Sequence, residues 1–299
     1  MALGPIALGR VRVDRCAEGP LLGSRAMEVA YQGEPGAYSE RAVRSLFPDA
    51  TPMPCDTVRL VFSRVTSGEA GFGVVPLENS QAGSVNEVYD LLQHTSLLHI
   101  VGEAVVRVDH ALLASPGSRL EGIRRAHSHW QALAQCEEFL SSMRIDPVPV
   151  HDTAGAARMI AERGNHEDAA IASVDAGTRM GLAVLAERIQ TEKENFTKFA
   201  AIGMSDPRLA EADKTSLVMA VLDEPGSLLA SLAPFAARGI NLHKLESRPR
   251  RGKPFEYVFY VDLMAAADDD DVRDALTEVA AHTSLLRVLG SYASAGDPV

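Results

Sequence analysis

Short apolar runs alternate with segments of helical periodicity along most of this 299-residue chain, and that alternation limits the fold more than any other feature. Strands that alternate with helices favour sheets covered by helices on both faces. We therefore expect an α/β protein. The runs predict strands over residues 28–31, 73–76, 101–113 and 169–172, and the periodic segments predict helices over 39–46, 85–92, 130–140, 154–162 and 173–182.

Four of the expected connections between a strand and the following helix consist of small or hydroxyl residues. Such turns expose unpaired backbone amides at the positive end of a helix dipole, which stabilises a nearby anion by about 0.3–1 kcal/mol. We expect them to border a crevice that holds a small, carboxylate-rich ligand, although each could also be only a helix cap or a backbone turn. These connections are Gly33-Glu34-Pro35-Gly36, Pro76-Leu77-Glu78-Asn79-Ser80, Asp152-Thr153 and Ala172-Ser173.

A polar, proline-containing stretch at residues 205–213 predicts a domain boundary. Beyond it the expected order becomes strand, helix, strand, strand, helix, strand, which predicts a ferredoxin-like module. We assign residues 1–26 to a flexible extension, 27–205 to a first domain and 213–291 to the module.

Composition excludes several classes of partner. The formal net charge of −11 disfavours nucleic acid and anionic membranes, but a small anion can still bind where cations are placed locally. The three cysteines are far apart and lack the spacing of a zinc site or a disulfide framework. The first residues lack a basic region followed by a long apolar core, so we expect no signal peptide, no membrane span and a cytoplasmic protein.

The pentapeptide Asn195-Phe196-Thr197-Lys198-Phe199 places one hydroxyl and one cation between two phenylalanines. Taken alone, it is typical of an ordinary strand start. A binding cleft would also use this pattern, because aromatic walls exclude water while the hydroxyl and the ammonium bind the polar groups of a ligand.

Six motifs in order resemble those of the prephenate dehydratases and the plant-type arogenate dehydratases, and the resemblance covers residues 29–289. It implies a two-lobed catalytic part similar to periplasmic binding proteins, with lobes at about 27–105 with 187–205 and at 106–186, and an active cleft between them. The motifs are YQGEPGAYS at residues 31–39, VPLENS at 75–80 with Gly83-Ser84, QALAQC at 131–136, DTAGAA at 152–157, AIAS at 170–173 and NFTKF at 195–199.

The resemblance implies the decarboxylating dehydration of prephenate to phenylpyruvate in phenylalanine biosynthesis, with no metal or organic cofactor. The barrier to this reaction is the departure of hydroxide, and a positioned donor accelerates such a step about 10²–10⁴-fold. The donor implied by the resemblance is Thr197. A threonine hydroxyl is too weak an acid to act alone, so we predict a relay with Ser80, Asn79 or a water, and we count Glu78 among the catalytic residues.

The side-chain carboxylate of prephenate needs a partner, because burying it uncompensated costs several kcal/mol. We predict that Lys198, the amides after Thr153 or Ser173, or both, bind this carboxylate. Further substrate contacts are predicted for Phe196, Phe199, Ser39 and Gln131.

The C-terminal module resembles an ACT-type regulatory domain through Glu246-Ser247-Arg248-Pro249 and the turn Pro225-Gly226-Ser227-Leu228. The resemblance implies a homodimer or homotetramer that binds phenylalanine between regulatory domains. The residues predicted to bind this effector are Gly226, Ser227, Leu228, Glu246, Ser247, Arg248 and Pro249.

Two departures from the family pattern keep other functions open. Lys198 replaces the arginine of the usual Thr-Arg-Phe, and Trp130 replaces a proline. Lysine keeps the charge but loses the planar fork that suits a carboxylate. The alternatives are a non-aromatising prephenate decarboxylase, an arogenate dehydratase, and a sensor that binds its ligand without turnover.

Overall fold

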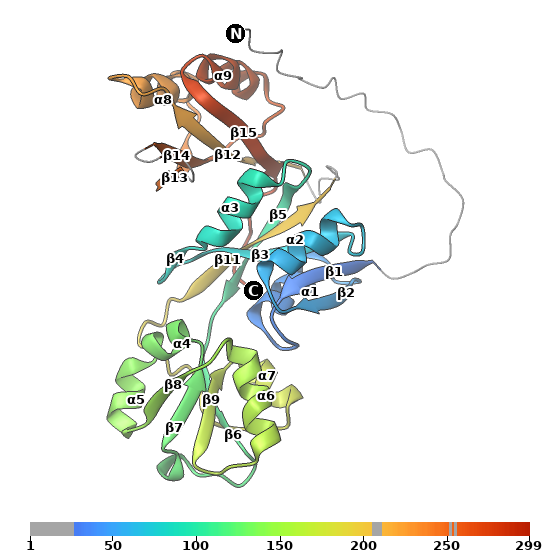
Figure 1. The fold of residues 1–299 in the computed structure, drawn as a ribbon, viewed down its shortest axis with the longest axis vertical. Coiled ribbons are helices and arrows are strands. Elements are labelled where there is room, and N and C mark those ends of the chain that lie inside the picture. Colours follow the sequence, from blue (N-terminus) through green and yellow to red (C-terminus); the bar gives the residue numbers. More distant parts are fainter. Residues whose placement is uncertain (1–26, 205–210, 251–252, 254–255) are drawn as a thin grey trace, which may run out of the picture.

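The computed structural model describes residues 27–204, 211–250, 253 and 256–299, so the predicted extension at 1–26 lies outside it. These residues form three sheets, which lie one after another along the long axis of the molecule (Figure 1). We call the middle unit the first lobe, the unit that contains α8 (Ser227–Ala237) and α9 (Asp270–Ala280) the C-terminal unit, and the unit at the other end the second lobe. The order of helices and strands confirms the predicted α/β class.

The first lobe is built on a sheet with the strand order β2-β1-β3-β11-β5, with β4 (Gly83–Ser84) paired to β3. Strands β1, β2 and β3 are parallel, and β11 runs antiparallel to both β3 and β5. The bounds are β1 Glu28–Gln32, α1 Tyr38–Leu46, β2 Thr51–Cys55, α2 Val58–Thr66, β3 Phe72–Asn79, α3 Asn86–His94, β5 His99–Arg107 and β11 Phe196–Gly203.

Strand β11 shows how the two faces of this sheet are used. Phe199 and Ala201 pack with α1, whereas Ala200 and Ile202 pack on the face that α2 and α3 cover. Successive side chains of a strand point to opposite faces, so Thr197 shares the α1 face and Lys198 the opposite face. The pairing with β5 is regular from Phe196 to Ala201, which preserves this alternation.

The second lobe is inserted between β5 and β11. Its sheet has the order β10-β6-β9-β7-β8, in which β7 lies parallel to both of its neighbours. The bounds are β6 Ala111–Ala114, β7 Arg125–Ser128, α4 Trp130–Gln135, α5 Glu137–Met143, β8 Asp146–Pro149, α6 Thr153–Arg163, β9 Asp168–Ala172, α7 Val174–Arg179 and β10 Ala183–Ala186, with a short 3-10 turn at Leu120–Gly122.

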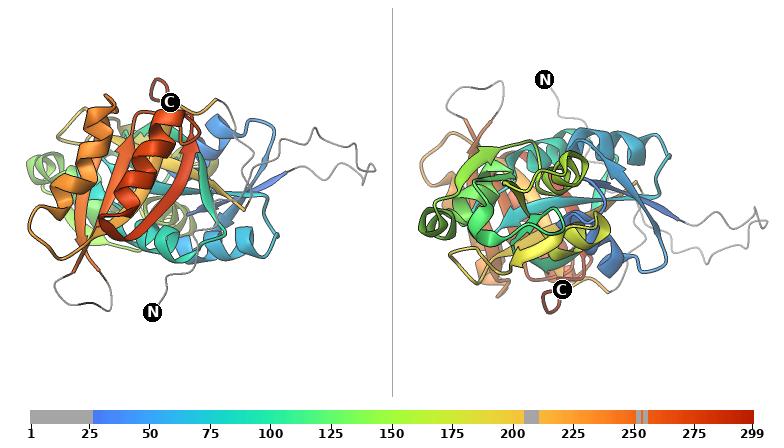
Figure 2. Two further views of the ribbon diagram at one scale, coloured as in Figure 1. Left: turned by 90° about the horizontal axis from the view of Figure 1, so that it is seen from above. Right: turned by 90° about the horizontal axis from the view of Figure 1, so that it is seen from below.

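The C-terminal unit has the predicted ferredoxin-like order, with its strands arranged β13-β14-β12-β15. One face of this sheet packs against α8 and α9, which lie side by side on the outer surface (Figure 2). The other face packs on the first lobe, where a Cβ added at Gly290 would overlap the carbonyl oxygen of Ile100. The bounds are β12 Lys214–Val221, α8 Ser227–Ala237, β13 Leu242–Pro249, β14 Tyr257–Leu263, α9 Asp270–Ala280 and β15 Thr283–Tyr292.

Two predicted elements are divided in the structure. The apolar run at 101–113 forms the end of β5 and the start of β6, because it is buried in both lobes and periodicity cannot reveal the crossing between them. The predicted helix at 130–140 breaks at Cys136 into α4 and α5. The carbonyl oxygen of Gln135 accepts a hydrogen bond from the amide of Thr191 at 2.8 Å instead of one within the helix.

Candidate active site

A cleft of about 380 Å³ lies between the two lobes. Its walls come from the starts of α1 and α6, from α4, from the end of β3 and from the start of β11. Strand alternation explains why Thr197 and Phe199 both line it. The predicted site residues that the structure brings together on this wall are Ser39, Asn79, Gln131, Thr153, Thr197 and Phe199.

The hydroxyl of Thr197 is held by Asn79. Two backbone amides, those of Gln81 and Ala82, donate to Asn79 Oδ1 at 3.0 and 2.9 Å, so this atom must be the carbonyl oxygen. Asn79 Nδ2 therefore faces Thr197 Oγ1 and donates to it at 2.9 Å, and this hydrogen is shared with the carbonyl oxygen of Phe196 at 3.1 Å. Because Thr197 accepts this bond, its own hydrogen is left to donate to a ligand in the cleft.

The same reasoning extends along a chain of amide side chains. Asn79 Nδ2 also donates to Asn195 Oδ1 at 2.8 Å, which turns Asn195 Nδ2 towards Gln135 Oε1 at 3.0 Å. Gln135 Oε1 is thus an acceptor, and it lies 2.9 Å from His110 Nε2. His110 Nε2 must therefore carry a proton. The backbone amides of Gln81 and Ala82 therefore fix the orientation of each amide side chain in the network as far as the His110 imidazole.

His110 is a neutral, buried group on the cleft wall. Its side chain lies inside the protein, and burial lowers the pKa of the imidazole, although the hydrogen bond to Gln135 opposes this shift. Its Nδ1 lies 3.4 Å from the hydroxyl of Tyr38, which donates at 2.5 Å to the carbonyl oxygen of Asp109. The unprotonated Nδ1 is therefore an acceptor beside the cleft. No sequence motif pointed to His110, whereas Tyr38, Gln135 and Asn195 lie inside quoted motifs.

Two helices begin at the cleft. No side chain caps the N-terminus of α1, and Ala37, Tyr38 and Ser39 all line the cleft. At α6, Asp152 caps the helix by accepting from the amide of Gly155 at 2.6 Å, and the first helical residue, Thr153, lines the cleft. Both helix dipoles thus present their positive ends to the cleft.

Lys198 and Phe196 are not on the wall of this cleft. Both lie on the opposite face of β11 from Thr197, and Lys198 is paired in the sheet with Glu78. The guanidinium of Arg107 lies 5.6 Å from the centre of the Phe196 ring. Direct contact between these two residues and a substrate stays a prediction. Among the described residues that line the cleft, no lysine or arginine occurs.

Ser80, Glu78 and Ser173 make structural contacts near the cleft. Ser80 Oγ accepts from the amide of Phe196 at 3.0 Å and so fastens the β3–β4 hairpin to β11. Glu78 forms an ion pair with Lys244 of the C-terminal unit. Ser173 caps α7 and donates to the carbonyl oxygen of Gly36 at 2.7 Å, which ties the two lobes together.

The predicted effector residues divide between two places. Glu246 and Arg248 share one face of β13 with Lys244, and this face points towards the first lobe, where Arg248 donates to the carbonyl oxygen of Asn86 at 3.1 Å. Ser247 and Pro249 are exposed on the other side of the strand. In the other place, Gly226 has a φ of +87° before α8, Ser227 is buried, and Leu228 packs against the core of the C-terminal unit.

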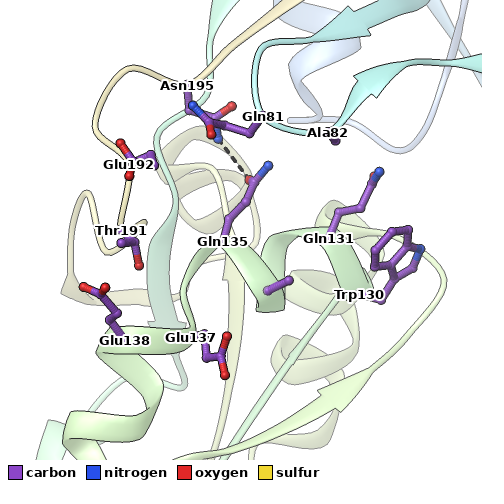
Figure 3. Close-up of a pocket in the computed structure, with 11 residues that line it drawn as sticks. Gln81, Ala82, Trp130, Gln131, Gln135, Glu137, Glu138, Thr191, Glu192 and Asn195 are labelled. Atoms are coloured by element: carbon purple, nitrogen blue, oxygen red, sulfur yellow. Dashed lines mark hydrogen bonds between the residues drawn. The ribbon is translucent and has the colours of Figure 1, made fainter.

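A second hollow of about 440 Å³ adjoins the cleft (Figure 3). It shares Ala82, Gln131 and Gln135 with the cleft, and the hydrogen bond between Asn195 and Gln135 crosses its wall. Trp130 stands at one side with 61% of its surface exposed. The cleft therefore continues into this hollow.

Within residues 27–204, 211–250, 253 and 256–299, no three histidine, cysteine or acidic side chains are grouped as a metal ion would need. No helix in this part of the chain is long and apolar enough to cross a membrane. Cys55 and Cys136 are buried free thiols, and Cys16 lies outside the described residues.

Comparisons with known proteins agree with the architecture. The family model for prephenate dehydratase matches residues 29–207, and the ACT domain model matches residues 215–281. Arogenate dehydratase 1 of Petunia hybrida is 43% identical over 291 residues, which covers 91% of this chain and 68% of the relative. Arogenate dehydratase/prephenate dehydratase 2, chloroplastic, of Arabidopsis thaliana is 42% identical over 281 residues, with 90% and 73% covered.

Solved structures also match most of the chain, and two of them are the following. Prephenate dehydratase from Arthrobacter aurescens in complex with L-Phe has a TM-score of 0.80 at 35% identity, with 89% of this chain and 90% of that chain covered. GqqA, described as a novel type of quorum quenching acylases, has a TM-score of 0.81 at 35% identity, with 89% and 98% covered.

Proposed function

Because the chain belongs to the prephenate dehydratase family, we propose that it converts prephenate to phenylpyruvate by decarboxylating dehydration, with residues 27–205 as the catalytic part. The observation that supports this most directly is the Thr197 hydroxyl, which accepts from Asn79 and keeps its hydrogen for the cleft. A lyase of this kind needs such a donor where hydroxide leaves the ring.

The reaction balances without a redox partner. The ring carboxylate leaves as carbon dioxide, the electrons of its carbon–carbon bond complete the aromatic ring, and hydroxide departs from the opposite carbon to become water on protonation. The Thr197 hydroxyl stabilises the charge that develops on the departing oxygen. Its hydrogen bond with Asn79 orients this hydroxyl before the substrate arrives. Phe199, on the same face of β11, helps to exclude water.

We assign the side-chain carboxylate of the substrate to the helix starts at Ser39 and Thr153. Both line the cleft, whereas Lys198 lies on the other face of its strand. This assignment separates the two parts of the substrate: the helix dipoles hold the carboxylate that stays, and Thr197 meets the hydroxyl that leaves. Binding the departing ring carboxylate equally tightly would oppose the reaction, because only contacts that strengthen in the transition state accelerate it.

One observation favours arogenate as a second candidate substrate. Glu87 and Asp152 line the cleft, and no lysine or arginine is among the described residues that do so. Arogenate carries an ammonium group where prephenate carries a ketone, so its side chain brings a positive charge that these acids would attract. The product would then be phenylalanine itself.

The remaining parts of the proposal concern regulation and context. We propose phenylalanine as effector of the ACT domain, assigned to residues 213–291, because a relative of known structure was solved in complex with L-Phe. A cytoplasmic homodimer or homotetramer remains the expected state.

The test gives the purified protein prephenate and arogenate in separate assays and measures phenylpyruvate, phenylalanine and carbon dioxide. Thr197→Ala is expected to lower kcat at least about 10²-fold with unchanged thermal stability, and Thr197→Ser to keep much of the activity. Equal turnover by Thr197→Ala and the parent would remove Thr197 from the mechanism. Carbon dioxide without an aromatic product would identify a non-aromatising decarboxylase, and binding without conversion a sensor.

Lys198→Met decides between the two carboxylate sites. Loss of substrate affinity in this variant would support the lysine clamp and contradict the assignment to the helix starts. A KM close to that of the parent would support the helix starts.

A further inference from the structure

The C-terminal unit contacts the catalytic hairpin through one strand. Along β13, Lys244 and Glu246 contact the β3–β4 hairpin at its strands, where Glu78 pairs with Ser84. Lys244 Nζ lies 3.0 Å from Glu78 Oε2 and donates to Ser84 Oγ at 2.7 Å, so one ammonium binds both strands of the hairpin. Glu246 Oε2 accepts from Ser84 Oγ at 2.5 Å.

The ammonium of Lys244 is enclosed and balances two acids. Its side chain is only 10% exposed, and its Nζ lies 3.0 Å from Glu246 as well as from Glu78. It also lies 5.1 Å from the centre of the Tyr89 ring. Burial alone would raise the pKa of Glu246, but the hydrogen bonds from Ser84 and Lys244 hold that pKa below its ordinary value. Without the ammonium, two carboxylates would face each other across the contact.

The residue next to Glu78 is Asn79, which orients Thr197. Asn79 depends on the shape of the same hairpin, because the amides of Gln81 and Ala82 in its turn fix the direction of its side chain. The geometry of the hairpin therefore sets the geometry of the Asn79–Thr197 bond. A shift of about 1 Å in such an arrangement can cost about 10²-fold in rate.

We propose that Lys244 is a positioning residue of the active site: from the C-terminal unit it fixes the hairpin that carries Asn79, and through Asn79 it aims the Thr197 hydroxyl. The proposal rests on the proposed function for its kinetic consequence.

The experiment compares three variants of the full chain. In Lys244→Met, kcat is expected to fall about tenfold or more while KM changes little, because the substrate contacts remain and only the donor is misaligned. Lys244→Arg keeps a cation and is expected to recover most of kcat. The matched control is Lys253→Met, which removes an exposed lysine of the same unit that pairs only with Glu256 among the described residues.

Hydrogen exchange provides a readout that does not depend on turnover. The amides of Gln81 and Ala82 donate to Asn79, so they are expected to exchange faster in Lys244→Met than in the parent and in Lys253→Met. Unchanged exchange at these amides, or a kcat within twofold of the parent, would overturn the proposal. A parent protein that converts neither substrate would refute the proposed function, and the exchange result would still decide whether Lys244 holds the hairpin.

Discussion

The first lobe has two interfaces of opposite character. Towards the C-terminal unit it shares one continuous apolar core, in which Leu92 and Ile100 pack with Val218, Tyr260 and Leu289. A buried triad reinforces this interface: the ammonium of Lys214 lies 2.8 Å from Glu103 and 3.1 Å from Asp262, and all three side chains are less than 10% exposed. Arg287 adds hydrogen bonds to four carbonyl oxygens at and after the C-terminal end of α3.

Towards the second lobe the contacts are polar and mostly exposed. Arg158 binds both carboxylate oxygens of Glu34 at 2.8 Å, with half of its side chain exposed. Arg179 reaches Glu40, and Ser173 donates to the carbonyl oxygen of Gly36. Ala37 is the main apolar exception, since it packs against the core of the second lobe.

Because the two interfaces differ, we expect the two lobes to move relative to each other more easily than the first lobe and the C-terminal unit do. Separating the C-terminal unit would expose an apolar core and a buried ion triad, whereas separating the lobes breaks contacts that water can replace. The cleft can therefore open to admit a ligand while the contact of Lys244 with the β3–β4 hairpin stays in place.

The largest expected effect comes from breaking the buried triad. Lys214→Met would leave Glu103 and Asp262 as buried carboxylates without their cation, and we expect the free energy of unfolding to fall by about 3–5 kcal/mol. Denaturant unfolding measures it, with Lys253→Met as the matched control. A loss below about 1 kcal/mol would show that this interface is not the stronger of the two.

A smaller effect is expected where the lobes approach each other most closely. Gly36 has a φ of +92°, and a Cβ there would lie 2.6 Å from the Cα of Ala176, so Gly36→Ala would push the lobes apart. We expect kcat/KM to fall about tenfold or more, with about 1–3 kcal/mol of stability lost.

Gly164→Ala is the matched control for this change. Gly164 also has a positive φ, of +62°, but a Cβ there meets nothing within 4 Å. It reproduces the backbone strain without the close approach. Equal activity losses in the two variants would contradict a role for the Gly36 contact in closing the cleft.

The pH dependence of stability should reveal His110 at the cleft. Burial keeps the pKa of its imidazole below 6.5 in the native state, so the unfolded chain binds a proton that the folded chain resists. The contribution of His110 is thus fully present above pH 6.5 and is lost as pH falls below this value. When the pH is lowered from about 7.5 to about 5.5, the melting temperature of His110→Gln should fall less steeply than that of the parent protein. Parallel profiles for the two proteins would contradict a neutral His110.

The smallest effect is expected at the exposed ion pair between the two lobes. Arg158→Ala should leave the free energy of unfolding almost unchanged, because its ion pair with Glu34 is open to water and screened by salt. The measurement is denaturant unfolding at low and at high salt. A loss as large as that of Lys214→Met would remove the distinction between the two interfaces.

The sequence allowed prediction of the elements whose pattern is local. The βαββαβ order and the helix at 154–162 were predictable because periodicity and turn residues coincide there. Strands β2 and β8 were missed because each carries two prolines, at Pro52 and Pro54 and at Pro147 and Pro149. Both are edge strands, where a residue without an amide hydrogen is tolerated.

For the site, the motifs led to Asn79 and Thr197 but not to the direction of their neighbours. Lys198 was predicted to bind the substrate carboxylate because of its charge, whereas strand alternation places it on the other face of β11 from Thr197. The role of His110 could not be predicted from the sequence, because it depends on contacts with Gln135 and Tyr38, which lie far away in the chain. Only the folded chain brings these residues together.

The central position of β11 has a consequence for biosynthesis. This strand lies between β3 and β5 in the sheet, yet the ribosome makes it only after the whole second lobe. Until then β3 and β5 each present an open edge, which is a template for pairing with another chain. A chain released before residue 196 therefore leaves the first-lobe sheet incomplete, and its open strand edges favour aggregation.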